Sequence, residues 1–176
     1  MMQDLSDDER SQFFQFAPKY RNIQCGLYRH RQKFIPKTPT SKDDFDALHD
    51  WLKIDGKETI VKYDGKTPCD GRILFFSTDM SLKILSKAKT FTIDGTFKSC
   101  PLLWHQVVIF MAQVSESMFV PVGFAFLPNK SYNSYKKLFK GMLNYMEKNL
   151  DLSMNKSHVM CDFEPALRKG ISDCFT

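Results

Sequence analysis

The sequence lacks a long uncharged apolar stretch, and this sets the first limit on what the chain can be. A transmembrane helix needs about 18 or more consecutive apolar residues, and no such run occurs among the 176 residues. The first ten residues are acidic and lack the apolar core of a secretory signal. We therefore expect a protein that is neither secreted nor embedded in a membrane, and that works inside the cell.

Cysteine pairs at metal-binding spacing are also missing. The five cysteines are scattered along the chain, at Cys25, Cys69, Cys100, Cys161 and Cys174. No two of them form a CxxC pair, and Cys25 with His30 finds no second pair at zinc-finger spacing. We interpret the cysteines as reduced structural thiols, which fits an intracellular compartment.

Acidic residues are absent from one long stretch of the sequence. The net charge of the whole chain, +5, does not reveal this uneven distribution. Residues 1–9 carry four acids and no base, whereas residues 10–42 carry eight Lys or Arg and no acid. The densest part includes Arg29, Arg31 and Lys33. Such a segment can neutralise the phosphates of a nucleic acid. The alternative is a solvated connecting arm, because a basic run alone is a weak signal.

No internal repeat or low-complexity tract is visible, and the chain divides at composition changes. The segment "KFIPKTPTSK" holds two prolines and three hydroxyl residues, which is typical of a linker. We therefore expect a basic N-terminal arm and linker over residues 1–40, a helix-and-hairpin lead-in over 41–90, and a compact core over 91–176.

Within the lead-in, local patterns predict two helices and a hairpin. Ser41, with Asp44 three residues on, predicts a helix start that the spacing of Phe45, Leu48 and Leu52 would continue. The segments "ETIVKY" and "GRILFFS" predict a β-hairpin. The segment "DMSLKILSKAK" predicts a second helix, capped by Ser77 or Thr78, with an apolar face of Met80, Ile84, Leu85 and Ala88.

The core shows a clear order of elements. Three strands are predicted at "TFTIDGTFKS", "HQVVIFMAQV" and "MFVPVGFAFLP", and Pro121 places the third at a sheet edge because proline cannot donate to the ladder. A helix follows, then a fourth strand at "HVMCDFE", and a last helix with Pro165 near its first turn. The first of these helices is predicted to bury Tyr135, Leu138, Met142, Tyr145 and Met146. The order β-β-β-α-β-α predicts an α/β fold with a mixed sheet.

Two aspartates stand out against this order. In "FTIDGTF" the side chains alternate, so that Phe91, Ile93 and Phe97 face one way and Asp94 faces the other with two threonines. Asp162 lies at the end of the fourth strand. If the crossover places that strand beside the first, the two carboxylates approach each other, and a divalent cation such as Mg²⁺ or Mn²⁺ would relieve their repulsion. The alternative is that each aspartate caps a strand end or accepts a backbone N–H.

The glycine after Asp94 fits the metal interpretation. Gly95 would leave room beside a metal ion or a substrate backbone. Lys98 and Lys130 could help to hold a phosphate, or lie solvated at the surface. His105 and His158 flank strands and are interpreted as structural residues.

The segments "IDGTFKSCP", "HQVVIF", "VPVGFAFLPNKSYNSYKKLF" and "VMCDFEPAL" together resemble the core of Mutator-like (MULE-type) transposases. The lead-in segments "LYRHRQKFIPKTPTSKDDF" and "GRILFFSTDMSLKILSKAKTF" resemble what precedes that core in members that carry a FLYWCH zinc finger. The resemblance covers roughly residues 21–175. It implies a ribonuclease H-like fold, a DDE-class enzyme of DNA transposition that uses Mg²⁺ or Mn²⁺, and a nuclear protein that binds DNA.

By this resemblance, Asp94 is the first catalytic carboxylate and Asp162 the second. The third acid of the family lies on a later helix, and the nearby Glu164 is better placed to meet a helix N-terminus. The chain thus resembles a truncated transposase, for which we expect weak metal binding, little or no cleavage, and self-association through an exposed edge of the sheet.

Two other interpretations stay open. One is a non-catalytic DNA- or protein-binding module derived from a transposase, with Arg29, Arg31, Lys33 and Lys98 as nucleic-acid contacts. The other is a ribonuclease H-like nuclease that recruits its third ligand from elsewhere.

Overall fold

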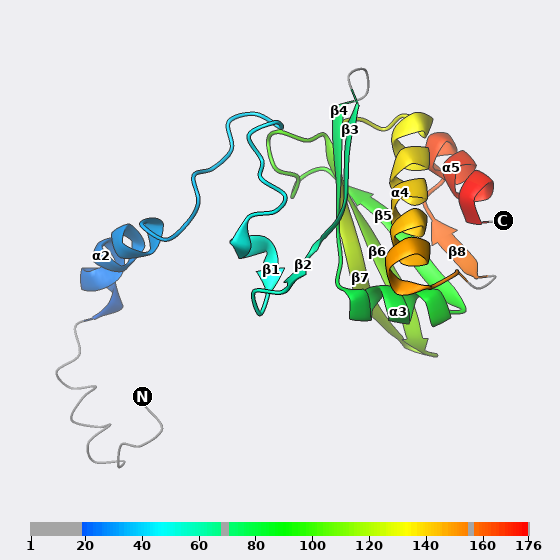
Figure 1. Ribbon diagram of the computed structural model, residues 1–176, viewed down its shortest axis with the longest axis horizontal. Helices are drawn as coiled ribbons and strands as arrows, with labels where there is room; N and C mark the ends of the chain where they lie inside the picture. The colour runs from blue at the N-terminus through cyan, green and yellow to red at the C-terminus, as the bar shows by residue number, and fades with distance from the viewer. Residues whose placement is uncertain (1–18, 68–70, 155–156, 176) are drawn as a thin grey trace, which may run out of the picture. The chain divides into compact units, whose positions relative to one another are not determined.

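The computed structural model describes residues 19–67, 71–154 and 157–175 (Figure 1). The chain divides into two units, Met1–Thr38 and Pro39–Thr176. In the first unit the described element is helix α2 (Tyr20–Gln32), which has no buried residue. Within the described ranges, no helix has both the length and the hydropathy that crossing a membrane requires.

The second unit is built on a six-stranded mixed sheet with the order β3-β4-β7-β6-β5-β8. Its strands are β3 (Val61–Thr67), β4 (Gly71–Phe76), β5 (Thr90–Thr96), β6 (Gln106–Ser115), β7 (Met118–Leu127) and β8 (His158–Cys161). All neighbouring strands are antiparallel except β5 and β8, which are parallel. A separate two-stranded sheet joins β1 (Lys53–Ile54) to β2 (Glu58–Thr59) after a 3₁₀ turn at Asp50–Leu52.

Three helices of this unit pack their apolar stripes against the sheet: α3 (Asp79–Lys87), α4 (Tyr132–Leu150) and α5 (Pro165–Phe175). Figure 1 shows α4 and α5 side by side on one face of the sheet. The shared core includes Phe91, Phe110, Leu138 and Phe139, all fully buried. From β5 onward the elements follow the predicted order β-β-β-α-β-α, and the predicted mixed α/β class is confirmed.

The predicted hairpin forms as β3 and β4, and it extends the main sheet instead of standing ahead of it. The predicted helix after Ser41 is wrong, because residues 41–49 form turns. The Asp44 carboxylate accepts hydrogen bonds from Thr40 and Ser41, and Asp46 accepts one from the Leu48 N–H. These local bonds satisfy backbone donors without a helix, which is how Asp and Ser compete with helical structure.

The edge position predicted for the strand with Pro121 is also wrong, since β7 lies between β4 and β6. The proline is accommodated at a bulge, where the β6–β7 register shifts between Phe110 and Met111. It also lies outside the Phe124–Phe126 stretch of β7 that pairs with β4.

Two side chains predicted on buried faces are exposed. Met80 is 67% exposed, because α3 instead buries Leu82 and Leu85 against the core. Phe97 is 44% exposed, because it follows the last residue of β5 and so leaves the alternation of that strand. The predicted cap of α3 is confirmed at Thr78, whose hydroxyl accepts from the Ser81 N–H.

Candidate metal-binding site

The strand that carries Asp94 and the strand that leads to Asp162 are neighbours. Strand β5 pairs with β8 in parallel, and the register aligns Ile93 with Cys161. Each aspartate stands one position beyond this aligned pair. The crossover through α4 therefore brings together two parts of the sequence that are far apart, as the order of elements predicted.

Both aspartates lie on the surface of the second unit. Ile93 is buried and Cys161 packs against the same core, whereas Asp94 and Asp162 are exposed. Among the described residues, neither carboxylate has an ion-pair or hydrogen-bond partner. Carboxylates without a protein partner are hard oxygen donors of the kind that Mg²⁺ and Mn²⁺ prefer.

Two carboxylates are fewer than the three acids that the DDE resemblance implies. In the part of the chain that the structure describes, no group of three or more His, Cys, Asp or Glu side chains is placed to hold a metal ion. The four described cysteines are free thiols, at Cys25, Cys100, Cys161 and Cys174, and Cys69 lies outside the described residues. Burial raises the pKa of the Cys161 thiol next to the site.

The space beside Gly95 is occupied by a glutamine. A Cβ atom at Gly95 would lie 3.3 Å from Oε1 of Gln106, the one atom within 4 Å among the described residues. Gln106 is fully buried, and its Nε2 donates to the Tyr135 hydroxyl at 2.6 Å. Sequence reasoning missed this glutamine, although a lone polar residue at the start of the apolar segment "QVVIF" is a signal that a buried partner exists.

Glu164 is engaged by protein groups. Its Oε1 accepts a hydrogen bond from the Tyr135 hydroxyl at 2.9 Å, and its Oε2 lies 3.8 Å from Nζ of Lys130. Burial raises the pKa of Tyr135, and the adjacent Glu164 carboxylate raises it further, so this hydroxyl remains a donor at neutral pH. These contacts bind Glu164 to the α4 side of the sheet.

The other residues singled out in the sequence differ in their surroundings. Lys98 is exposed in the turn after β5. Lys130 pairs with Glu164 and its Nζ lies 3.9 Å from the centre of the Phe97 ring. The ring of His105 packs edge-on against Phe97, and its backbone N–H donates to the Leu127 carbonyl. His158 is exposed on β8.

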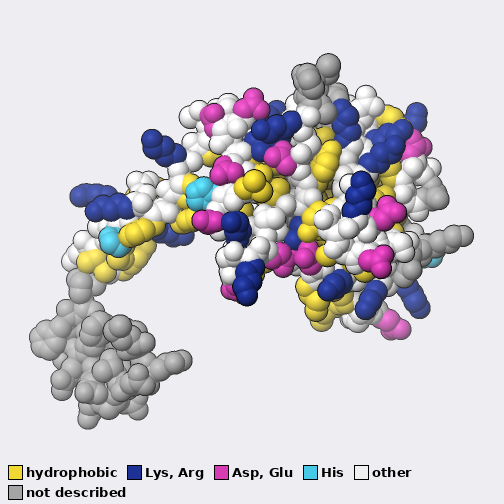
Figure 2. All heavy atoms as spheres, in the orientation of Figure 1, with side chains coloured by type: hydrophobic (Ala, Val, Ile, Leu, Met, Phe, Trp, Pro, Cys, Tyr) yellow, Lys and Arg dark blue, Asp and Glu magenta, His cyan; other side chains and the backbone are white. Residues whose placement is uncertain are grey.

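Helix α2 in the first unit carries the basic cluster. Arg29 and Arg31 lie in its last turn, Lys33 caps its C-terminus, and all three are exposed. Figure 2 shows Lys and Arg side chains beside exposed hydrophobic ones along this helix. Cations near a helix C-terminus are favoured by the helix dipole, so the cluster also stabilises α2.

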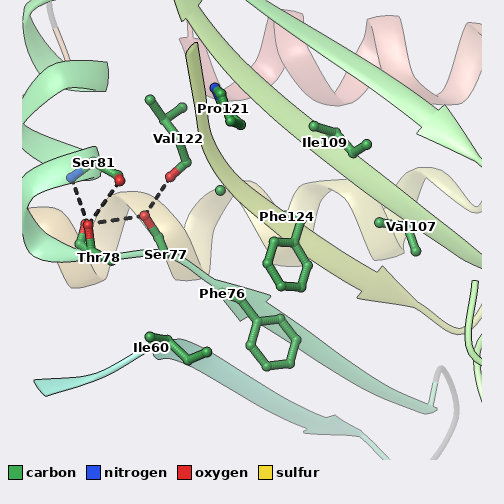
Figure 3. Close-up of a pocket in the computed structure, with 11 residues that line it drawn as sticks. Ile60, Phe76, Ser77, Thr78, Ser81, Val107, Ile109, Pro121, Val122 and Phe124 are labelled. Atoms are coloured by element: carbon green, nitrogen blue, oxygen red, sulfur yellow. Dashed lines mark hydrogen bonds between the residues drawn. The ribbon is translucent and has the colours of Figure 1, made fainter. Parts of the chain in front are cut away.

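An apolar groove of about 430 Å³ lies on the sheet near α3 (Figure 3). Ile60, Phe76, Ile109 and Phe124 contribute to its walls. The hydroxyls at its end are bonded to protein atoms: that of Ser77 donates to the Val122 carbonyl, and those of Thr78 and Ser81 bond each other. The groove offers apolar contact and no reactive group, so it is not a candidate active site.

Comparison with known proteins agrees with the resemblance seen in the sequence. Residues 90–176 match the family model of the MULE transposase domain. No match was found among curated proteins or among solved structures. The match begins with β5 and includes both aspartates and the α4 crossover between them. The part of the chain from residue 90 to residue 176 therefore belongs to the MULE transposase domain family.

Proposed function

We propose that this transposase-derived domain has a ribonuclease H-like fold in which Asp94 and Asp162 bind Mg²⁺ or Mn²⁺. The observation that supports the proposal is the parallel β5–β8 pairing, in a register that aligns Ile93 with Cys161, the residues directly before the two aspartates. Relatives of this class would cut and join DNA by two-metal phosphoryl transfer, as the DDE resemblance implies.

The topology supports the ribonuclease H-like assignment. Strands β5, β6 and β7 form an antiparallel meander, and α4 then crosses over to β8, which lies parallel to β5 on its free side. Ligands of sheets with such crossovers bind near strand ends, where the chain leaves the sheet. Asp94 lies near the end of β5 and Asp162 follows the end of β8.

The donor set fits a weakly held divalent cation. Both carboxylates are exposed and form no ion pair among the described residues. When bound, metal ions in such sites would activate an attacking oxygen and stabilise a leaving oxygen. The role of Asp94 and Asp162 would be to hold and orient the metal ions. With two carboxylates we expect weak metal binding and, in this chain by itself, no efficient cleavage of DNA.

Mn²⁺ binding tests the proposal, because free Mn²⁺ can be counted by its paramagnetic resonance signal. Wild type should take up Mn²⁺ with weak affinity, and Asp94→Asn or Asp162→Asn should abolish most of it. Asp151→Asn is the matched control, since this exposed residue caps α4 at φ 53°, a conformation that Asn also tolerates. Equal uptake by wild type and both site variants would refute the site.

A second function is favoured by α2, namely binding of DNA without sequence preference. Its described residues, all exposed, include Arg21, Arg29 and Arg31 and no acid. Positive charges on one helix neutralise phosphates, and Lys98 near the metal site could add a contact. The domain could then serve as a non-catalytic DNA- or protein-binding module, or as a nuclease that recruits its third ligand from elsewhere.

Three further features belong to the proposal alone. A domain that acts on DNA would work in the nucleus or wherever the cell keeps its DNA. That a FLYWCH zinc finger accompanies the domain in a longer protein stays a prediction. The division of the chain into three segments at residues 40 and 90 also stays a prediction.

A further inference from the structure

Two consecutive hydrogen bonds, one buried and one partly buried, connect Gln106, Tyr135 and Glu164. Gln106 donates through Nε2 to the Tyr135 hydroxyl, and Tyr135 donates to Oε1 of Glu164. The direction of these hydrogen bonds follows from chemistry. The Tyr135 hydroxyl has one hydrogen to donate, and it donates it to Glu164, so it accepts from the amide N–H of Gln106.

This direction leaves the other end of the glutamine amide without a partner. Oε1 of Gln106 is buried and has no hydrogen-bond partner among the described residues. It lies against Gly95, where a Cβ would be 3.3 Å away. The series of hydrogen bonds therefore begins beside Gly95, next to Asp94, and ends at Glu164, two residues after Asp162.

Lys130 connects the same two places by a second route. Its ammonium group lies 3.8 Å from the Glu164 carboxylate and 3.9 Å from the centre of the Phe97 ring. Phe97 follows the last residue of β5, so this contact links the end of β5 to the start of α5. Two separate contacts thus join the segment of Asp94 to the segment of Asp162, in addition to the backbone pairing of β5 with β8.

We propose that Gln106, Tyr135 and Glu164 are positioning residues that fix the separation and orientation of the Asp94 and Asp162 carboxylates. This inference rests on the proposed metal site. Without the Tyr135 hydroxyl, residues 162–164 lose their hydrogen-bonded connection to α4 and β6. The side chains of Asp94 and Asp162 themselves are not changed. Metal affinity should then fall even though both ligands remain, because partners that orient metal ligands typically contribute about 10–100-fold in affinity.

Tyr135→Phe and Tyr145→Phe form a matched pair for the test. Both residues lie on α4, and each hydroxyl bonds a carboxylate: that of Tyr145 bonds Asp79 at 3.1 Å, in a different part of the unit. Tyr135→Phe should weaken Mn²⁺ binding about tenfold. Tyr145→Phe should leave Mn²⁺ affinity unchanged, although thermal unfolding without metal should reveal a loss of stability in both variants, because each loses one hydrogen bond to a carboxylate.

A metal-free measurement accompanies this test. Amide hydrogen exchange of a peptide covering residues 158–168 should accelerate in Tyr135→Phe and not in Tyr145→Phe. Glu164→Gln should keep Mn²⁺ affinity near that of wild type, because its amide oxygen still accepts from Tyr135, whereas Glu164→Ala should reproduce the loss.

The outcomes separate this inference from the metal site itself. If wild type binds Mn²⁺ through Asp94 and the two tyrosine variants bind it equally well, the positioning role is refuted and the site stands. Unchanged exchange in Tyr135→Phe refutes the role as well. If wild type binds no Mn²⁺, the proposed site falls and the positioning role falls with it.

Discussion

Gly95 lies directly behind Asp94, and its missing side chain leaves space that the Gln106 amide fills. The 3.3 Å separation of a built Cβ from Oε1 is tighter than ordinary contact. The glutamine cannot move away freely, because it is fully buried and bonded to Tyr135. The sequence suggested room for a metal or substrate at this glycine, whereas the structure places a neighbouring side chain there.

We therefore expect Gly95→Ala to lower the free energy of unfolding by about 1–2 kcal/mol, as overpacking of buried sites does. The measurement is urea unfolding, done as a double-mutant cycle with Gln106→Ala. In the Gln106→Ala background the clash is gone, so Gly95→Ala should change stability little. Equal losses in both backgrounds would mean that the glycine is needed for another reason.

Lys62 is a buried cation with a side chain that is 1% exposed. Its Nζ lies 2.7 Å from both Glu58 and Asp79, and the Tyr145 hydroxyl also bonds Asp79. Desolvation opposes ionisation of Asp79, but the hydrogen bonds from Lys62 and Tyr145 outweigh it and hold the pKa of Asp79 below its ordinary value. The network joins the start of α3 to β3 and α4.

The lowered pKa of Asp79 gives the sign of a pH dependence. The stabilisation is present above the ordinary pKa of 3.8, and it is lost as the pH falls through the lower folded-state pKa. Since Asp79 is 34% exposed on its side chain, we expect Asp79→Asn to lower the free energy of unfolding by only about 1–2 kcal/mol at pH 7. Urea unfolding should show the gap to wild type closing below about pH 4.

The control for this prediction is the exposed pair of Lys53 and Asp50, which has the same 2.7 Å separation. Asp50→Asn should change stability much less, because water screens an exposed pair. A gap between wild type and Asp79→Asn that stays constant from pH 7 to pH 2.5 would contradict the assigned role of the Asp79 charge.

At the scale of elements, the sequence predicts what depends on local periodicity. The α4 stripe is an example, since Tyr135, Leu138, Met142 and Met146 are buried as the 3.6-residue spacing predicted. The predictions of secondary structure fail where tertiary structure or local hydrogen bonds override the sequence pattern. Pro121 lies inside the sheet because a bulge absorbs it, and residues 41–49 form turns because aspartates bond the nearby backbone.

For α2, the prediction concerns salt. Each phosphate neutralised on duplex DNA contributes a slope of about −0.9 to log K against log salt. Replacing Arg29, Arg31 and Lys33 by alanine should lower affinity and flatten the slope by up to about 2.7. Fluorescence anisotropy with a labelled random-sequence duplex, titrated at several salt concentrations, measures both quantities.

A charge-matched control distinguishes α2 from general attraction. The triple change of Lys57, Lys87 and Lys89 to alanine removes the same charge from exposed positions of the second unit. It should alter the slope much less. Asp94→Asn should leave the affinity unchanged or slightly higher, through lost repulsion. An equal effect of both triple variants would show that net charge, and not α2, governs binding.

At the scale of the whole molecule, β8 is the last strand in the order of the six-stranded sheet, and its outer edge has no strand beside it among the described residues. Exposed edges invite pairing with other chains. We expect concentration-dependent association in sedimentation velocity, which Met160→Lys should reduce, because Met160 is 55% exposed on this strand. A monomer at all concentrations for wild type would contradict the prediction.

The surroundings of the candidate site were predictable only where they depend on the order of elements, and not where they depend on tertiary packing. The pairing of the strand before Asp162 with the strand of Asp94 follows from the order of elements, since a crossover leads to a parallel neighbour. That the two aspartates bind a metal stays a prediction. The chain through Gln106, Tyr135 and Glu164 draws on β6, α4 and the start of α5, and no local pattern links these three positions. Only their packing in the folded unit brings them together.

The last prediction concerns cleavage of DNA. Three carboxylates are typical of two-metal phosphoryl transfer in this class, and the third nearby acid, Glu164, is held by Tyr135 and Lys130. We therefore expect the purified chain to leave supercoiled plasmid intact in the presence of Mg²⁺ or Mn²⁺. Asp94→Asn, purified in parallel, controls for a contaminating nuclease. Nicking by wild type that Asp94→Asn abolishes would show that the site is complete, and Glu164→Gln would then test whether Glu164 leaves its partners to serve as the third ligand.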